Sequence, residues 1–107
     1  DGKIDFTAVF AVTGEIVPGA MQSLREYGYR LPEDISIISL TSEKIGEFYH
    51  PALTAVCADL SAQIAAAFGG LQKILDGEIA RFRSCIPMKL VERQSVKTIN
   101  HTQGVLK

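Results

Sequence analysis

The sequence predicts an α/β domain built on a parallel β-sheet, and three observations support this fold class. Short apolar runs occur at residues 7–12, 35–40 and 53–57, as expected for strands. Segments with helical periodicity lie at residues 15–27 and 59–75. Strands and helices largely alternate along the chain and are joined by short polar turns. This order is typical of a parallel sheet covered by helices, as in a Rossmann-like domain.

The first strand and the first helix are bounded by clear signals. Residues 7–12 are nearly all apolar, which is typical of a strand buried on both faces of a parallel sheet. In the helix that follows, apolar residues recur at positions 16, 17, 20, 21, 24 and 27. Pro18 is compatible only with the first turn, because a proline deeper in a helix removes a hydrogen bond and clashes. Gly28 stands where a glycine commonly ends a helix.

Two further strands are predicted in the middle of the chain. Residues 31–34 read Leu-Pro-Glu-Asp and have the composition of a turn, and residues 35–40 predict a second buried strand. Residues 41–50 are polar and loop-like, with a helical turn expected near residues 43–48. Residues 53–57 predict a third short strand.

The last helix and strand follow. Asp59 or Ser61 is expected to cap the helix, and Asp76-Gly77 to end it. Gly69-Gly70 interrupts the helix at a cost of about 1 kcal/mol per glycine relative to alanine. We therefore expect close packing of another element against this pair. Residues 86–91 predict the final strand.

Composition limits the classes of protein to consider. The chain has 107 residues, a formal charge of −1 and 47% hydrophobic residues, which fits one globular domain at most. The balance of charges argues against nucleic-acid binding by this segment itself. No apolar run approaches the length of a membrane span. Cys57 and Cys85 have the spacing of neither a metal site nor a disulfide framework, so a reduced, cytoplasmic environment fits best.

Chain organisation predicts that this is a segment of a longer protein. The N-terminal residues have neither an initiator methionine nor the apolar region of a signal peptide. Two long helices give thin cover for such a sheet, so one helix face is expected to need a partner outside the segment. Residues 1–95 are expected to form the folded portion of the domain, and residues 96–107 a polar tail.

The sequence lacks the common motifs of catalytic and metal-binding sites. The sequence contains no G-x-S-x-G elbow, no H-E-x-x-H and no phosphate loop. His50 and His101 have no carboxylate or cysteine partner at a useful spacing. We therefore predict no catalytic residues, no metal and no cofactor. A small α/β enzyme would need a nucleophile or metal set that the sequence does not show.

A ligand site is a more promising interpretation, because ligands of open α/β sheets bind beyond the carboxyl ends of the strands. Those ends are followed here by Thr13-Gly14-Glu15, Thr41-Ser42-Glu43 and Cys57-Ala58-Asp59. Their hydroxyl and carboxylate groups predict a small polar ligand. The same residue types also cap helices, and the pattern alone leaves both interpretations open.

An ordered series of motifs resembles the lac/gal-repressor (LacI/GalR) family of bacterial transcription regulators. The motifs run in register over most of the chain, from Thr7 to Ser95: Thr7-Ala8-Val9-Phe10-Ala11, Glu15-Ile16-Val17-Pro18-Gly19-Ala20, Leu24-Arg25-Glu26-Tyr27-Gly28, Leu31-Pro32-Glu33-Asp34-Ile35-Ser36-Ile37-Ile38, Pro51-Ala52-Leu53-Thr54-Ala55-Val56 and Leu90-Val91-Glu92-Arg93-Gln94-Ser95.

The resemblance implies part of a periplasmic-binding-protein-like effector domain, in which two α/β subdomains close over a small molecule. A helix-turn-helix and most of the N-terminal subdomain would lie outside this chain, so operator DNA would be bound only by the absent part. The helix after Asp59 would lie on the N-terminal subdomain before the chain returns. The implied protein is a cytoplasmic, non-enzymatic repressor that responds to an effector. The alternative is a periplasmic sugar-binding transport receptor of the same fold, exported and monomeric.

The effector positions implied by the resemblance are Thr13, Gly14, Thr41 and Asp59. The family usually carries Asn-Asp or Ser-Asp where this sequence has Thr13-Gly14. It usually carries an aspartate at the position of Thr41. A threonine hydroxyl is uncharged and cannot chelate two sugar hydroxyls. An atypical effector, such as a phosphorylated sugar, is therefore expected, with loss of ligand binding as the competing possibility.

The resemblance also implies a homodimer. The family dimerises through the first helix and the loop after the second strand, and the corresponding residues are Pro18, Met21, Gln22, Arg25, Ile45 and Tyr49. We expect the helical residues of this set to form an exposed stripe, separate from a core stripe of Val17, Ala20, Leu24 and Tyr27. The alternative is that Met21 and Tyr49 only edge the core.

Overall fold

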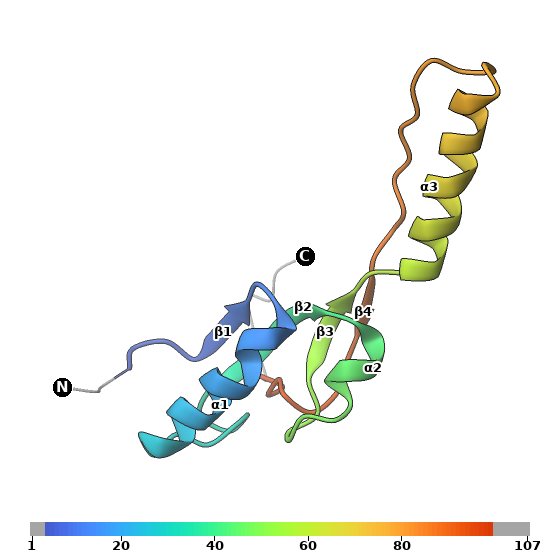
Figure 1. The fold of residues 1–107 in the computed structure, drawn as a ribbon. Coiled ribbons are helices and arrows are strands. Elements are labelled where there is room, and N and C mark those ends of the chain that lie inside the picture. Colours follow the sequence, from blue (N-terminus) through green and yellow to red (C-terminus); the bar gives the residue numbers. More distant parts are fainter. Residues whose placement is uncertain (1–3, 100–107) are drawn as a thin grey trace.

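The computed structural model describes residues 4–99 and shows a four-stranded sheet with one helix packed on it and one projecting from it (Figure 1). In chain order the elements are β1 (Ala8–Ala11), the 3-10 helix η1 (Gly14–Ile16), α1 (Val17–Glu26), β2 (Ser36–Thr41), α2 (Glu43–Gly46), β3 (Thr54–Cys57), α3 (Leu60–Leu75) and β4 (Lys89–Val91). The predicted α/β class is confirmed.

The sheet has the strand order β1-β2-β3-β4. The first three strands are parallel, but β4 is antiparallel to β3, so the expectation of an entirely parallel sheet is wrong for the last strand. The register gives the reason. The chain leaves the sheet after Cys57, and Cys57 is paired with Lys89, where the chain returns. A strand that begins beside the end of its neighbour must run in the opposite direction.

Strand β1 lies at an edge of the sheet and is less buried than its apolar sequence predicts. Ala11 is 2% exposed, whereas Phe10 is 54% exposed and Val12 just beyond the strand is also exposed. Within residues 4–99, β1 pairs only with β2. A strand of this position buries one face well and the other only when something else covers it. The prediction that residues 7–12 are buried on both faces is therefore wrong for this chain.

Helix α1 packs on one face of the sheet through its first two turns. The buried core consists of Ala11, Val17, Met21, Ile37, Leu53, Ala55 and Cys57. Met21 is only 3% exposed, so the expectation that it lies on an exposed stripe is wrong. Tyr27 is 70% exposed, so its assignment to the core stripe is also wrong. The reason is helix geometry: Val17 and Met21 are four residues apart and face the sheet together, whereas α1 ends before Tyr27.

The residues predicted to start and end the helices lie as expected, except that the helix predicted from residue 15 begins as the 3-10 helix η1 and becomes α1 only at Val17. Pro18 lies in the first turn of α1, and Gly28 follows this helix with a positive φ of 90°, a conformation that favours glycine. Asp59 caps α3 by accepting a hydrogen bond from the backbone N–H of Ala62 at 3.0 Å. The short helix α2 begins after Ser42, whose hydroxyl accepts from the N–H of Ile45.

Helix α3 projects away from the sheet, and the chain returns beside it in an extended conformation (Figure 1). Gly70 is buried, and a Cβ there would overlap the ring of Phe82 on the returning segment. The expected close packing is thus confirmed for Gly70. At Gly69, no atom of the described residues lies within 4 Å of an added Cβ. The expectation of close packing is therefore wrong for Gly69. The exposed apolar side chains of α3 are Leu60, Ile64, Phe68, Leu71, Ile74 and Leu75.

The segment after β4 ties β2 and β3 together at their amino ends. The Ser95 hydroxyl is buried, donates to the carbonyl of Ile37 at 2.5 Å and accepts from the N–H of Thr54 at 2.8 Å. The carbonyl of Ser95 also accepts from the N–H of Ile37 at 2.9 Å. This contact holds the two central strands in register, so that their carboxyl ends reach the same edge of the sheet.

Candidate functional site

The carboxyl ends of the three parallel strands bring two of the predicted effector positions into contact. Thr41 ends β2, where it is paired with Cys57 at the end of β3. Gly14 begins η1, just after β1, and lies directly against the Thr41 side chain. A Cβ added to Gly14 would lie 2.6 Å from the Cβ of Thr41. The two positions form one packed corner, which we call the Gly14–Thr41 corner.

Gly14 is buried and enclosed on two sides. The Thr41 side chain covers its Cα, and the Tyr49 hydroxyl donates a hydrogen bond to its carbonyl at 2.9 Å. Gly14 therefore serves packing more than ligand contact in this structure. Thr13 beside it is exposed, and Thr41 is partly exposed, so these two residues present the hydroxyl groups of the corner.

Asp59 lies apart from Gly14, in a hollow of about 740 Å³ at the base of α3. It shares this hollow with Ser42, which follows Thr41 in the chain, and with Cys57, which pairs with Thr41 in the sheet. One carboxylate oxygen of Asp59 caps α3, so the capping interpretation holds for this residue. Burial raises the pKa of the neighbouring Cys57 thiol. A thiol shifted in this direction stays protonated and is a poor nucleophile.

Two basic residues of the same hollow hold α2 in place. The Arg93 guanidinium donates to the backbone carbonyls of Leu53 and Glu43, each at 2.6 Å. Lys89, the first residue of β4, forms an ion pair with Glu43, with Nζ 3.0 Å from Oε2. No local signal could have revealed this pairing, because the partners are 46 residues apart and meet only through the sheet.

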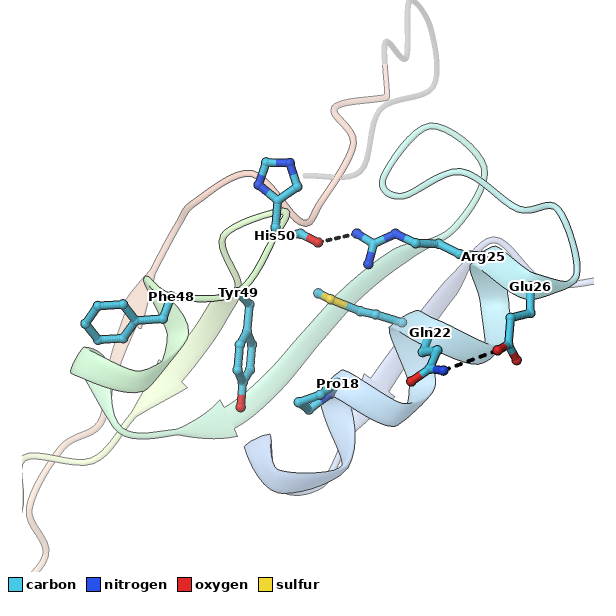
Figure 2. A pocket seen from close by; sticks show the side chains of 8 residues that line it. Pro18, Gln22, Arg25, Glu26, Phe48, Tyr49 and His50 are labelled. Atoms are coloured by element: carbon cyan, nitrogen blue, oxygen red, sulfur yellow. Dashed lines mark hydrogen bonds between the residues drawn. The ribbon is translucent and has the colours of Figure 1, made fainter.

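A groove of about 610 Å³ lies between α1 and the loop after α2 (Figure 2). Its lining residues are Pro18, Met21, Gln22, Arg25, Glu26, Phe48, Tyr49 and His50. Five of the six residues predicted for a dimer interface line it. Ile45 is the exception: it lies on α2 and is 48% exposed, but does not line this groove. We call this feature the α1 groove.

The α1 groove combines apolar surface with a few fixed polar contacts. Phe48 is 78% exposed at one end of it. The Arg25 guanidinium donates to the backbone carbonyl of His50, which joins the helix to the loop (Figure 2). Gln22 donates to the Glu26 carboxylate at 3.2 Å. Exposed aromatic surface beside ordered polar groups is typical of protein interfaces.

The described residues show no further chemical centre. Within residues 4–99, no group of three or more His, Cys, Asp or Glu side chains is placed to hold a metal ion. In the same part of the chain, no helix combines the length and the apolar character needed to cross a membrane. The polar tail predicted for residues 96–107 lies mostly outside the described residues.

Comparison with known proteins gives consistent results. Residues 3–96 match the periplasmic binding protein-like domain family. The chain is 35% identical over 95 residues to the HTH-type transcriptional repressor PurR of Vibrio atlanticus, covering 88% of this chain but only 28% of that protein.

Solved structures share the fold. The Escherichia coli transcriptional repressor AscG superposes with a TM-score of 0.74 at 30% identity, over 88% of this chain and 35% of that one. A sugar-binding transcriptional regulator of the LacI family from Escherichia coli, solved in complex with phosphate, has a TM-score of 0.74 at 30% identity, over 86% of this chain and 33% of that one.

The Gly14–Thr41 corner predicts a strong coupling between its two residues. Gly14→Ala should lower the free energy of unfolding by about 1–3 kcal/mol, because its Cβ must displace the Thr41 side chain. In the double variant with Thr41→Gly, the loss should be smaller than the sum of the two single losses. Urea unfolding of the intact protein measures all three.

Gly19→Ala is the matched control. Gly19 lies in α1, and a Cβ built there has nothing within 4 Å. This variant should be as stable as the original or more so by about 0.5–1 kcal/mol, because alanine favours a helix. Additive effects of the substitutions at residues 14 and 41 would show that the corner is not a packed unit.

Proposed function

Because this chain belongs to the LacI/GalR family and has its periplasmic binding protein-like domain, we propose that it forms the effector-binding and dimerisation part of a ligand-responsive transcriptional repressor. The proposal rests on one observation: the relatives found by sequence and those found by structure belong to the same class of regulators. The relatives at 30–35% identity are named as transcriptional repressors, and a repressor structure superposes on the same residues. We propose no catalytic role and a cytoplasmic location.

The remaining part of the protein is proposed to bind the DNA. The chain spans 28% of the length of the PurR relative, so most of such a protein would lie outside it. We assign operator binding to a helix-turn-helix in that absent part. Helix α3 supports the division, because it projects from the sheet with an apolar surface that includes Phe68 at 69% and Leu75 at 73% exposure. We propose that the N-terminal subdomain covers this surface.

The proposed effector is a sugar derivative that carries negative charge, such as a phosphorylated sugar. The Gly14–Thr41 corner contributes a hydroxyl and no carboxylate. A hydrogen bond to a charged acceptor is worth about 1.5–3 kcal/mol, against about 1 kcal/mol for a neutral one, so neutral sugar hydroxyls gain less here. The absence of carboxylates at these two positions also lowers repulsion of anions. Phosphate bound to the 30% identical LacI-family regulator supports this class of ligand.

Effector binding is proposed to act by a shift between conformations. The loops that end β1, β2 and β3 meet at one edge of the sheet, and both chain crossings to α3, after Cys57 and before Lys89, lie at that edge. A ligand held at this edge and by a second subdomain would fix the angle between them. The change in that angle would alter the spacing of the DNA-binding parts.

The α1 groove is proposed as the centre of the homodimer interface. It offers a buried floor at Met21, an exposed aromatic at Phe48 and fixed polar contacts at Arg25. A two-fold dimer needs one patch that fits a copy of itself. Residues of α1 line one side of the groove and residues of the loop after α2 line the other (Figure 2).

The class of protein is tested on the complete gene product. Its N-terminal sequence is expected to form a helix-turn-helix, and the purified protein should bind DNA from upstream of its own gene in a gel-shift assay. Deletion of that N-terminal part should abolish the shift. A cleaved signal peptide together with no DNA binding would instead identify a periplasmic sugar-binding transport receptor of the same fold.

The effector class is tested by thermal unfolding of the intact protein with glucose 6-phosphate, ribose 5-phosphate and their neutral counterparts, glucose and ribose. A ligand at about 100 times its Kd adds about 2.7 kcal/mol, so Tm should rise by several degrees with a phosphorylated sugar. Thr41→Val should weaken that binding about fivefold by removing one hydrogen bond.

Thr7→Val is the matched control for the hydroxyl, since Thr7 is exposed at the opposite end of β1. It should leave the rise in Tm unchanged. Inorganic phosphate alone separates recognition of the sugar from recognition of the anion. A response confined to the neutral sugars would contradict the proposal of an anionic effector.

The dimer is tested with charges placed on two faces of α1. Pro18→Asp puts a carboxylate on the rim of the α1 groove at a position where aspartate suits the helix start, so the fold should persist. Sedimentation of the intact protein should show a dimer Kd raised about tenfold or more, because like charges would meet across the two-fold axis. Ser23→Asp, exposed on α1 outside the groove, should change Kd by no more than about twofold. Equal effects of both substitutions would rule out this groove as the interface.

A further inference from the structure

We propose that Tyr49 is a positioning residue that couples the effector loop, residues 13–15, to the dimer interface in the α1 groove. This inference rests on the proposed function, because it joins the two sites assigned there. The family resemblance implies for Tyr49 either a place in the dimer interface or one at the edge of the core, and neither includes a contact with the effector loop. Its structure shows contacts with both sites through one side chain.

The side chain of Tyr49 spans the distance between the two sites. Its ring lines the α1 groove, and it packs against the buried core that contains Met21. Its hydroxyl, at the far end of the ring, donates to the Gly14 carbonyl at 2.9 Å. In Figure 2 the ring points from the loop toward the start of α1, beside Pro18. One rigid aromatic side chain therefore touches the interface along its length and the effector loop at its tip.

Gly14 has little freedom to move independently of Tyr49. It is buried, and the Thr41 side chain occupies the space above its Cα. A ligand that displaces Thr41 or turns the Thr13–Gly14 peptide would move the carbonyl that Tyr49 holds. The hydroxyl would have to follow or lose its hydrogen bond, at a cost of about 0.5–1.5 kcal/mol. The same carbonyl also accepts from the N–H of Val17, so its movement would reach the start of α1 as well.

The loop after α2, which carries Tyr49, is also fixed to α1 at a second point. The Arg25 guanidinium donates to the carbonyl of His50, the residue after Tyr49. The loop after α2 is thus bonded to Gly14, just before α1, and to Arg25 near the end of α1. A partner subunit that packs on the ring would restrict Tyr49 and, through the hydroxyl, the effector loop. Dimerisation would then change the affinity for the effector. By linkage, effector binding must change the dimer affinity in the reciprocal way.

The test uses hydrogen exchange and needs no identified effector. The intact protein is compared at concentrations well above and well below its dimer Kd, and exchange is followed in a peptide that covers residues 12–17. In the original protein the exchange of this peptide should be about fivefold slower in the dimer, because dimerisation fixes the Tyr49–Gly14 hydrogen bond.

Tyr49→Phe keeps the ring and removes the hydroxyl. This variant should have a weaker dimer by linkage, so it is measured well above and well below its own Kd, and exchange of the peptide should then be the same in monomer and dimer. Tyr27→Phe is the matched control, since Tyr27 is 70% exposed and lies outside the groove. It should retain the full difference between monomer and dimer.

The outcomes separate this inference from the proposed function. If Tyr49→Phe dimerises and retains the difference, the coupling is overturned and the proposed dimer stands. If exchange becomes faster but the ratio between monomer and dimer is unchanged, Tyr49 is only structural and the coupling is again overturned. A protein that is monomeric at every concentration would overturn the proposed dimer and this coupling together.

Discussion

The buried hydroxyl of Ser95 is the contact on which the arrangement of the site depends. It bonds to the Ile37 carbonyl and the Thr54 N–H, and so joins β2 to β3 at the end of the sheet opposite the candidate site. A hydroxyl buried in this way must keep its partners, because an unpaired polar group in the core costs about 1–3 kcal/mol. The register that it fixes places Thr41 beside Cys57. The loops proposed to bind the effector lie at one edge of the sheet because the strands below them are aligned.

Local packing then decides what each loop can offer to a ligand. At the Gly14–Thr41 corner, the threonine side chain fills the space that any side chain at residue 14 would need. The corner is therefore neutral and compact, and the only side-chain polar group of its two residues is the Thr41 hydroxyl. Close packing makes such a corner respond as a unit, because a side chain without free volume transmits displacement to its neighbours. The contact of Tyr49 with Gly14 extends that unit to the α1 groove.

Helix α3 differs from α1 in what its apolar side chains contact. Helix α1 buries Val17 and Met21 on the sheet of this chain, whereas α3 places its apolar side chains away from that sheet. Its internal contact is with the returning segment, where Gly70 meets Phe82. An amphipathic or apolar helix gains most of its stability from tertiary packing. The proposed second subdomain supplies the missing surface, and the two crossings of the chain beside Cys57 and Lys89 would connect the subdomains.

Much of the fold and part of the site could be predicted from the sequence. Within residues 4–99, periodicity and turn residues located α1, α3 and the four strands, and they predicted the glycine that follows α1 and the cap of α3 at Asp59. They did not separate η1 from α1, and they made the last strand longer than β4. These features depend on neighbours in the chain, so local patterns determine them. The motifs also identified the family, which the match over residues 3–96 confirms.

Only the tertiary structure decided the direction of β4, the burial of Met21 and the enclosure of Gly14. Each of these depends on residues distant in the sequence: β4 runs antiparallel because the chain returns at Lys89 beside the end of β3. The hydrogen bond from Tyr49 to Gly14 spans 35 residues and leaves no periodic trace. Local sequence thus determined what each segment of this protein is. Long-range packing determined which segments are in contact, because residues distant in the sequence meet only in the folded chain.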